Sequence, residues 1–199
     1  MRLRGMALAV PMKLPSITSK VLLTVFVATT LWAALVVTAP MMVPSRTLQD
    51  LSGVVGGHEN EFQFRDLNPL PHAIYWLGDG ECHQLANRSY FINGNQMPFC
   101  ARDLGLFLGI AVGFGIALFY RLKINPVLLL LGLIPMGIDG GLQLVTSYES
   151  NNPLRMITGV VAGISMALLM GYFVHVIQED RASRRAKNGP VQVQEPRQE

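Results

Sequence analysis

Four long apolar stretches, separated by polar segments, dominate the pattern along this chain of 199 residues. They comprise residues 21–43, 104–120, 126–145 and 156–177. A helix needs about 20 apolar residues to cross a hydrocarbon core of about 30 Å. The pattern therefore predicts an all-α membrane protein with four transmembrane helices and one long loop, residues 44–103, between the first and second helices.

The first stretch admits two interpretations, an uncleaved membrane anchor or a cleaved signal peptide. Basic residues precede it, as they do in a signal peptide. Its 23 residues exceed the usual apolar region of about 7–15 residues. The candidate cleavage site after the small residues Val37-Thr38-Ala39 is followed directly by Pro40, which suits a signal peptidase poorly. We therefore expect an uncleaved anchor.

The lysines and arginines divide unevenly between the two sides that four spans define. Eleven fall on the side of both termini and five on the other side. Because cytoplasmic segments carry the excess of Lys and Arg, we expect a cell-membrane protein with residues 1–20 and the tail of residues 178–199 in the cytoplasm. The tail is polar and is expected to be disordered. The net charge of +3 then reflects topology and requires no nucleic-acid partner.

Small residues recur at a spacing of four in two of the predicted helices. Such faces allow helices to approach closely in lipid, where hydrophobic burial contributes little. One interpretation is tight packing within a single four-helix bundle, and the other is a homo-oligomer or a membrane partner subunit docked on one face. The residues are Gly105, Gly109 and Gly113 in the second helix and Gly159, Gly163, Ala167 and Gly171 in the fourth.

Polar residues gather in four groups at the outer boundary of the predicted bilayer. The topology predicts that these groups meet in one outward-facing pocket. They are His83, Gln84, Arg88 and Ser89 in the loop, Arg102 and Asp103 where the second helix begins, Asp139 and Gln143 on one face of the third helix, and Glu149, Asn151, Asn152 and Arg155 before and within the start of the fourth.

Asp139 is the most informative of these residues, because a carboxylate inside a span is costly and usually has a partner. Arg88, Arg102 and Arg155 all lie on the correct side to pair with it. Two interpretations follow. The first is a buried Asp–Arg pair that fixes helix packing, and the second is a site for a ligand, a proton or an ion.

The two cysteines, Cys82 and Cys100, admit three interpretations. Outside the cytoplasm, two cysteines in one loop most simply form a disulfide. A zinc site with His83 and Asp103 has suitable ligand types, although adjacent Cys82 and His83 do not readily face one ion. Free or catalytic thiols are the third option. A thiol oxidoreductase of the DsbB type is disfavoured, because it needs a second redox pair and the chain has only two cysteines.

Four blocks of sequence resemble a known family. They read "CHQ", "RSYFINGNQMPFCAR", "PMGIDGGLQL" and "ESNNPLRMITG", and the similarity extends over about residues 81–171. In this order and spacing they are similar to the family called domain of unknown function 2085, a group of small prokaryotic integral membrane proteins. The resemblance implies a membrane location and marks these blocks as the site, and it implies no activity.

Three functions are consistent with the pattern. The expectation we favour is a protein of the lipid bilayer whose outward-facing pocket, floored by Asp139 and Gln143, binds or transports an ion or a small polar ligand. The alternatives are a membrane-embedded enzyme acting on a lipid-linked substrate and a purely structural subunit of a membrane complex. No catalytic residue is assigned, and no cofactor is expected apart from the zinc option at the cysteines.

Overall fold

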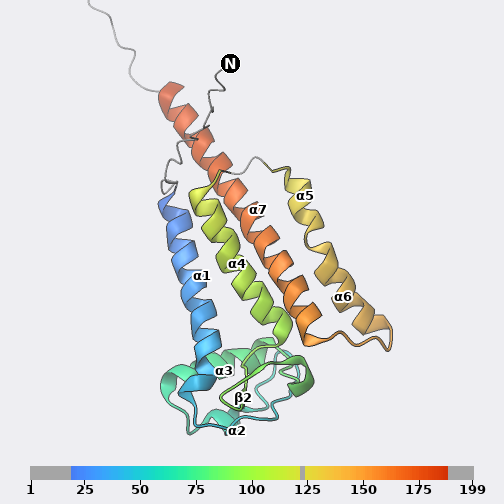
Figure 1. The fold of residues 1–199 in the computed structure, drawn as a ribbon. Helices are drawn as coiled ribbons and strands as arrows, with labels where there is room; N and C mark the ends of the chain where they lie inside the picture. Colours follow the sequence, from blue (N-terminus) through green and yellow to red (C-terminus); the bar gives the residue numbers. More distant parts are fainter. Residues whose placement is uncertain (1–18, 122–123, 188–199) are drawn as a thin grey trace, which may run out of the picture.

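The computed structural model describes residues 19–121 and 124–187. Within them, four apolar helical stretches stand side by side on a small polar unit (Figure 1). The stretches that are long and apolar enough to cross a membrane are Lys20–Met42, Ala101–Phe119, Pro126–Val145 and Asn152–Arg185. The prediction of a helical protein with four membrane helices is therefore confirmed. The expected N-terminal segment up to residue 18 and the tail beyond residue 187 lie outside the described residues.

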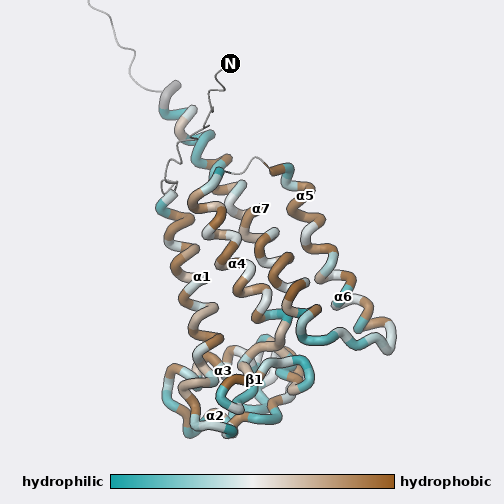
Figure 2. The backbone as a smooth tube through the Cα atoms, in the orientation of Figure 1, coloured by the Kyte–Doolittle hydropathy of each residue, from teal (hydrophilic) through white to brown (hydrophobic). Residues whose placement is uncertain are grey.

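The helical stretches consist of five α-helices and one short 3₁₀ helix. They are α1 (Lys20–Thr38), η1 (Ala39–Met42), α4 (Ala101–Phe119), α5 (Pro126–Leu131), α6 (Ile134–Val145) and α7 (Asn152–Lys187). We call residues 43–100, which connect η1 to α4, the cap. The start of α1 and the end of α7 lie at the opposite end of the bundle from the cap. Polar residues concentrate in the cap and in the α6–α7 loop, whereas the helices between are apolar (Figure 2). Which end faces the cytoplasm remains a prediction.

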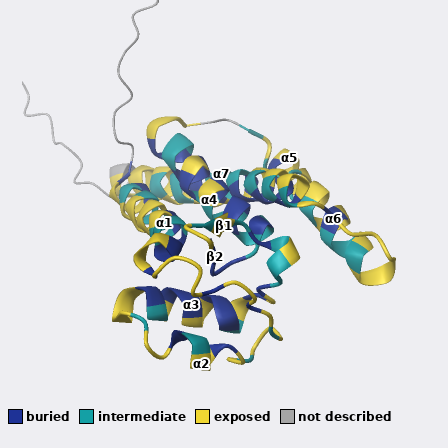
Figure 3. Ribbon diagram, turned by 60° about the horizontal axis from the view of Figure 1, so that its bottom comes forward, coloured by how far each residue is buried: buried dark blue, intermediate teal, exposed yellow. Residues whose placement is uncertain are grey.

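The glycine faces of α4 and α7 pack against each other within one chain. A Cβ atom added at Gly109 would lie 2.9 Å from the Cα of Val160, and one added at Gly163 would lie 2.8 Å from the backbone nitrogen of Ile110. Both separations are far below van der Waals contact. These glycines therefore allow backbone to touch backbone, as expected for helix packing in lipid. Figure 3 shows the resulting concentration of buried residues between α4 and α7.

The third membrane stretch, predicted as one helix over residues 126–145, is broken. Gly132 ends α5, and its N–H donates to the carbonyls of Leu129 and Leu130. Helix α6 starts again two residues later, with Pro135 in its first turn. Proline has no N–H to donate and its ring clashes with the carbonyl four residues earlier. A continuous helix through this Gly–Pro stretch is thereby prevented.

The predicted disordered tail is also shorter than expected, because α7 continues to Lys187. Composition suggested disorder, but residues 178–187 include three Arg and two Ala, which favour helix. Extending an existing helix also avoids the cost of nucleation. Asp180 accepts a hydrogen bond from Arg184 one turn later at 2.8 Å, and Glu179 pairs with Arg121 at 3.4 Å. Both ion pairs are exposed and add little.

The cap contains short elements around a hydrophobic core that continues into the bundle. The elements are α2 (Glu61–Phe64), α3 (Pro69–Glu81), η2 (Ala86–Arg88), β1 (Phe91–Ile92) and β2 (Asn95–Gln96). Phe64, Ile74 and Tyr75 are buried in a cluster that also includes Val36 of α1 and Leu104 of α4. The cap is therefore packed onto the ends of α1 and α4 and shares their core.

The hairpin β1–β2 was not predicted from the sequence. Phe91 pairs with Gln96 and Ile92 with Asn95, and the two turn residues, Asn93 and Gly94, have φ values of 56° and 72°. Two positive φ angles define the tight hairpin turn that Asn-Gly sequences favour. The buried Asn95 side chain then donates to the carbonyls of Pro40, Val43 and Pro44 at 2.9–3.2 Å. The hairpin thereby anchors the chain where it leaves η1.

Candidate functional site

The two cysteines meet where α3 ends and α4 begins. Cys82 is the C-cap residue of α3 and Cys100 is the N-cap residue of α4. The predicted disulfide is wrong for this structure, because both cysteines are free and their sulfurs lie 3.8 Å apart, compared with about 2.05 Å in a disulfide. The backbone N–H of Cys100 instead donates to the Cys82 sulfur at 3.4 Å.

Hydrogen bonding makes the two thiols unequal. The bond between them raises the pKa of Cys82 and lowers the pKa of Cys100, and burial raises the pKa of Cys82 further. The Cys100 thiol also lies 3.1 Å from a carboxylate oxygen of Asp103, one helical turn away. The donor atoms of Cys82, Cys100 and Asp103 all lie within 4.8 Å of one another. These three side chains are close enough to hold one metal ion.

A cavity of about 310 Å³ lies beside the cysteines, between the cap and the ends of α4, α6 and α7. Its size is at the lower end of the range for small-molecule sites. Three arginines line it, and no carboxylate of the described residues does. The predicted site residues on its wall are Cys82, His83, Gln84, Arg88, Cys100, Arg102, Gln143 and Arg155.

Asp139 pairs with Arg102, one of its three predicted partners, across α6 and α4. Its side chain is 5% exposed and also accepts a hydrogen bond from the Tyr148 hydroxyl at 3.3 Å. Asp139 is the one buried residue in the fully described helix α6. It does not floor the polar cavity as expected, because it faces an apolar cavity between α6 and α7 instead. The carboxylate therefore attaches α6 to the bundle.

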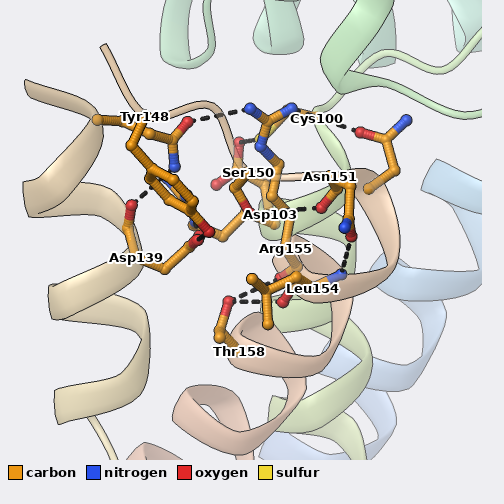
Figure 4. A network of polar contacts seen from close by, with 12 residues as sticks. Cys100, Asp103, Asp139, Tyr148, Ser150, Asn151, Leu154, Arg155 and Thr158 are labelled. Carbon is orange, nitrogen blue, oxygen red and sulfur yellow. Dashed lines mark hydrogen bonds and ion pairs between the residues drawn. The ribbon is translucent and has the colours of Figure 1, made fainter. Parts of the chain in front are cut away.

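Arg155 differs from the other two arginines of the cavity. It is 2% exposed, and among residues 19–121 and 124–187 its side-chain hydrogen bonds go to two amide oxygens, Gln143 Oε1 at 3.0 Å and Asn152 Oδ1 at 3.5 Å. Figure 4 shows Arg155 extending from α7 into this network, with Asp139 and Tyr148 on its α6 side. A buried guanidinium without a carboxylate partner is costly, so this residue needs an explanation.

Arg88 reaches the same cavity from the cap. Its guanidinium pairs with Glu149 at 3.1 Å, and the Glu149 side chain is 62% exposed. The Nε atoms of Arg88 and Arg102 are buried and have no hydrogen-bond partner among the described residues. Both arginines therefore carry an ion pair on one side and an unused donor on the other.

The remaining predicted residues stabilise the loops around the cavity. Gln84, at a positive φ of 45°, donates to the Pro98 carbonyl at 2.8 Å. Asn152 donates to the carbonyl of Ser89 at 3.1 Å and so joins α7 to the cap. Asn151 accepts from the backbone N–H of Leu154 at 2.9 Å, as a residue capping a helix N-terminus does. These contacts explain three amides and a serine without assigning them a ligand.

Sequence reasoning missed several residues of this region. Tyr148 was not singled out, although its hydroxyl reaches Asp139. Gln96 and Asn95 were also missed, and both are fully buried hydrogen-bonding side chains of the cap. All three lie inside or directly beside the polar blocks quoted above. No sequence pattern distinguishes an amide or a tyrosine that forms buried hydrogen bonds from the same residue at an ordinary loop position.

A membrane protein of four apolar helices, with a polar cavity beneath a small cap, is the class that the fold and the site define. The chain belongs to the family described as "Predicted membrane protein (DUF2085)", whose model matches residues 82–169. All the predicted site residues lie within this range. The resemblance seen in the sequence is therefore confirmed.

The chain is also similar to two uncharacterized archaeal proteins. The chain is 44% identical over 100 residues to an uncharacterized protein of Methanocaldococcus jannaschii, and the match covers 48% of this chain and 62% of that protein. It is 38% identical over 99 residues to an uncharacterized protein of Methanothermobacter thermautotrophicus, covering 48% of this chain and 89% of that protein. The chain thus spans less than two thirds of the first relative. No solved structure gives a significant match.

Proposed function

We propose that this protein binds a small oxyanion of the phosphate class in the arginine-lined cavity. The observation that carries the proposal is Arg155, a buried guanidinium with no carboxylate partner among the described residues. Guanidinium groups bind phosphate and carboxylate oxygens through paired, charge-assisted hydrogen bonds. The proposal narrows the expected ion or small polar ligand to an anion.

The balance of charge around the cavity supports an anion over a cation. Arg88, Arg102 and Arg155 line the cavity, whereas the nearby carboxylates of Asp139 and Glu149 are each engaged by one of these arginines. Arg155 forms no ion pair among the described residues, and the remaining nearby carboxylate, Asp103, does not line the cavity. The buried Nε donors of Arg88 and Arg102 add two unused hydrogen bonds. An anion in the cavity would supply a counter-charge for Arg155.

A purely structural role accounts for Arg102 better than for Arg155. Pairing with Asp139 ties α6 to α4, which is a sufficient reason for Arg102. Among the described residues, the side chain of Arg155 donates to neutral amides; it is repelled by Arg88 and Arg102 and is attracted by Asp139, with which it forms no ion pair. The two hydrogen bonds that the charged guanidinium donates to amide oxygens contribute about 1.5–3 kcal/mol each, whereas burying a guanidinium without a counter-charge costs several kcal/mol.

We expect the cap and this cavity on the outer side of the membrane, because the side of both termini carries the excess of Lys and Arg. The ligand would then come from the exterior or from the outer leaflet. Free phosphate and the phosphate of a lipid head group share the chemistry that arginines recognise. Binding, and not transport, is proposed, because four spans are few for a transporter acting alone.

Equilibrium dialysis with radiolabelled inorganic phosphate tests the proposal on the full chain in phosphatidylcholine nanodiscs. Wild type is expected to bind phosphate, and Arg155→Gln is expected to bind about 10- to 150-fold more weakly, because a charged hydrogen bond contributes about 1.5–3 kcal/mol. The matched control is Arg121→Gln, since Arg121 is exposed and lies at the other end of the bundle. Its affinity should equal that of wild type.

A second arm distinguishes the two sources of phosphate. Nanodiscs with anionic phosphatidylglycerol should compete with the radiolabel if the natural ligand is a lipid head group, and should leave its binding unchanged if the ligand is a free anion. The proposal fails if folded wild type binds neither phosphate nor anionic lipid. It also fails if Arg155→Gln binds as tightly as wild type.

A further inference from the structure

We propose that Cys82, Cys100 and Asp103 form a binding site for one zinc ion at the edge of the cavity. The site borders the oxyanion pocket, but its evidence does not depend on the oxyanion proposal. The donor atoms of the three residues lie within 4.8 Å of one another. They come from two different elements, the end of α3 and the first turn of α4, whose relative position is set by the cap core.

The spacing of the sulfurs fits a tetrahedral ion. Two thiolates at about 2.3 Å from a tetrahedral zinc are about 3.8 Å from each other. Cys82 and Cys100 are 3.8 Å apart. A zinc-bound sulfur and a carboxylate oxygen at about 2.1 Å from the same ion would be about 3.6 Å apart, and the Cys100 sulfur and the Asp103 oxygen are 3.1 Å apart. The Cys82 sulfur and the Asp103 oxygen lie within 4.8 Å of each other, so binding of the ion requires these two atoms to approach each other by up to about 1 Å.

Local backbone structure supports thiolates at these positions. Cys100 is the N-cap residue of α4, and Asp103 lies one turn later, where the helix dipole favours negative charge. The N–H of Cys100 donates to the Cys82 sulfur, an interaction that stabilises the charged form of a sulfur ligand. Cys82 is 5% exposed, so water competes poorly for it.

The charges and the ligand types select the metal. Two thiolates and a carboxylate carry three negative charges. Thiolates suit zinc and other borderline or soft ions, whereas magnesium and calcium prefer oxygen alone. In the described part of the chain, the side-chain contact of Asp103 is with Cys100, and no arginine or lysine forms an ion pair with it. A divalent cation would supply the missing counter-charge.

Three protein ligands leave one tetrahedral position free. Zinc sites with an open position are those in which a water or a ligand completes the shell. Cys82 and Cys100 both line the arginine cavity, so the open position would face the same space as Arg155. His83, also on the cavity wall, is exposed and is not among the three clustered donors. The zinc site considered from the sequence included His83, whereas the site proposed from the structure has Cys82, Cys100 and Asp103 as its ligands.

Elemental analysis of the full chain, purified under reducing conditions in phosphate-free buffer, tests this site. Wild type is expected to hold about one zinc per chain. Cys82→Ser and Cys100→Ser should each hold less than about a tenth of that amount, because neutral hydroxyls are poor zinc ligands. Asp103→Asn should weaken zinc at least about 10-fold in competition with a chelator. Glu81→Gln is the matched control, an exposed carboxylate beside Cys82 that lies outside the cluster.

Cobalt substitution detects the metal–thiolate bonds directly, so it distinguishes binding at this site from effects of misfolding. Wild type loaded with Co²⁺ should develop thiolate-to-metal charge-transfer absorption, and Asp103→Cys should retain it with a stronger signal from a third sulfur. Arg155→Gln should still bind one zinc, so failure of the oxyanion proposal would leave this site intact. The inference is overturned if folded, reduced wild type takes up no zinc and gives no charge-transfer band. It is equally overturned if Cys100→Ser retains a full equivalent.

Discussion

Replacing Arg155 or Arg102 with methionine should separate a ligand-binding arginine from a structural one. Arg102→Met leaves the Asp139 carboxylate, 5% exposed, with the hydroxyls of Tyr148 and Ser150 as its side-chain hydrogen-bond partners among the described residues. Breaking a buried ion pair from one side costs about 3–5 kcal/mol. For a protein of this size, 1 kcal/mol shifts the unfolding midpoint by about 2–4 °C, so the expected decrease is about 6–20 °C.

Arg155→Met should behave differently. It removes the hydrogen bonds that the charged guanidinium donates to Gln143 and Asn152, each contributing about 1.5–3 kcal/mol. It also removes an unpaired buried charge and its repulsion with Arg88 and Arg102. These effects oppose each other, and we expect a net change within about 1 kcal/mol, or within about 4 °C.

Thermal unfolding, followed by far-ultraviolet circular dichroism in one detergent at one scan rate, measures both variants with and without phosphate. At 100 times the dissociation constant, phosphate should stabilise wild type by about 2.7 kcal/mol, or about 5–11 °C, and should not stabilise Arg155→Met. The double variant Arg102→Met, Asp139→Met should recover most of the stability lost in Arg102→Met, because apolar replacement of a whole buried pair is often neutral.

One combination of results would contradict a ligand-binding role for Arg155. If Arg155→Met unfolds as early as Arg102→Met, and phosphate leaves the wild-type midpoint unchanged, both arginines are structural. The cavity would then be a packing defect between the cap and α6.

Two further predictions concern the bundle and the thiols. Gly109→Ala should destabilise the protein by about 1–3 kcal/mol through overpacking, because the new Cβ would lie 2.9 Å from the Cα of Val160, whereas Gly141→Ala meets nothing within 4 Å and should be neutral or stabilising. Equal unfolding midpoints for these two variants would contradict the interlocked helices. Iodoacetamide should modify Cys100 before Cys82 in metal-free protein, because the pKa of Cys100 is lowered and its side chain is less buried. Peptide mass spectrometry decides the order, and faster modification of Cys82 would contradict the hydrogen bond assigned between the thiols.

The membrane fold was predictable because lipid imposes simple rules on sequence. Long uncharged stretches identify spans, and glycines at a spacing of four identify close packing. The break between α5 and α6 was predictable in principle from Gly132 and Pro135, but apolar content alone conceals it. The hairpin turn at Asn93 and Gly94 was likewise visible as a turn signal. Its strands are only two residues long and lack the alternating apolar pattern by which strands are recognised.

The candidate site was predictable in composition and much less so in geometry. Topology alone indicated that the polar blocks meet near one membrane boundary. The choice of Arg102 as partner for Asp139 depends on the rotation of α4 against α6, which no residue spacing encodes. The separation of Cys82 and Cys100 depends on how the end of α3 packs against the start of α4. Two cysteines in one outer loop suggested a disulfide, whereas in the structure both are free.

Helix α6 connects the stability of the bundle to the state of the cavity. Asp139 is its one buried residue, and Gln143 accepts from Arg155 on the next turn. The contacts that attach α6 near the cap are thus polar and involve two of the three cavity arginines. An anion that draws Arg155 toward the cavity competes with Gln143 for the same donor. Because such coupling is reciprocal, occupancy of the cavity and the position of α6 must influence each other.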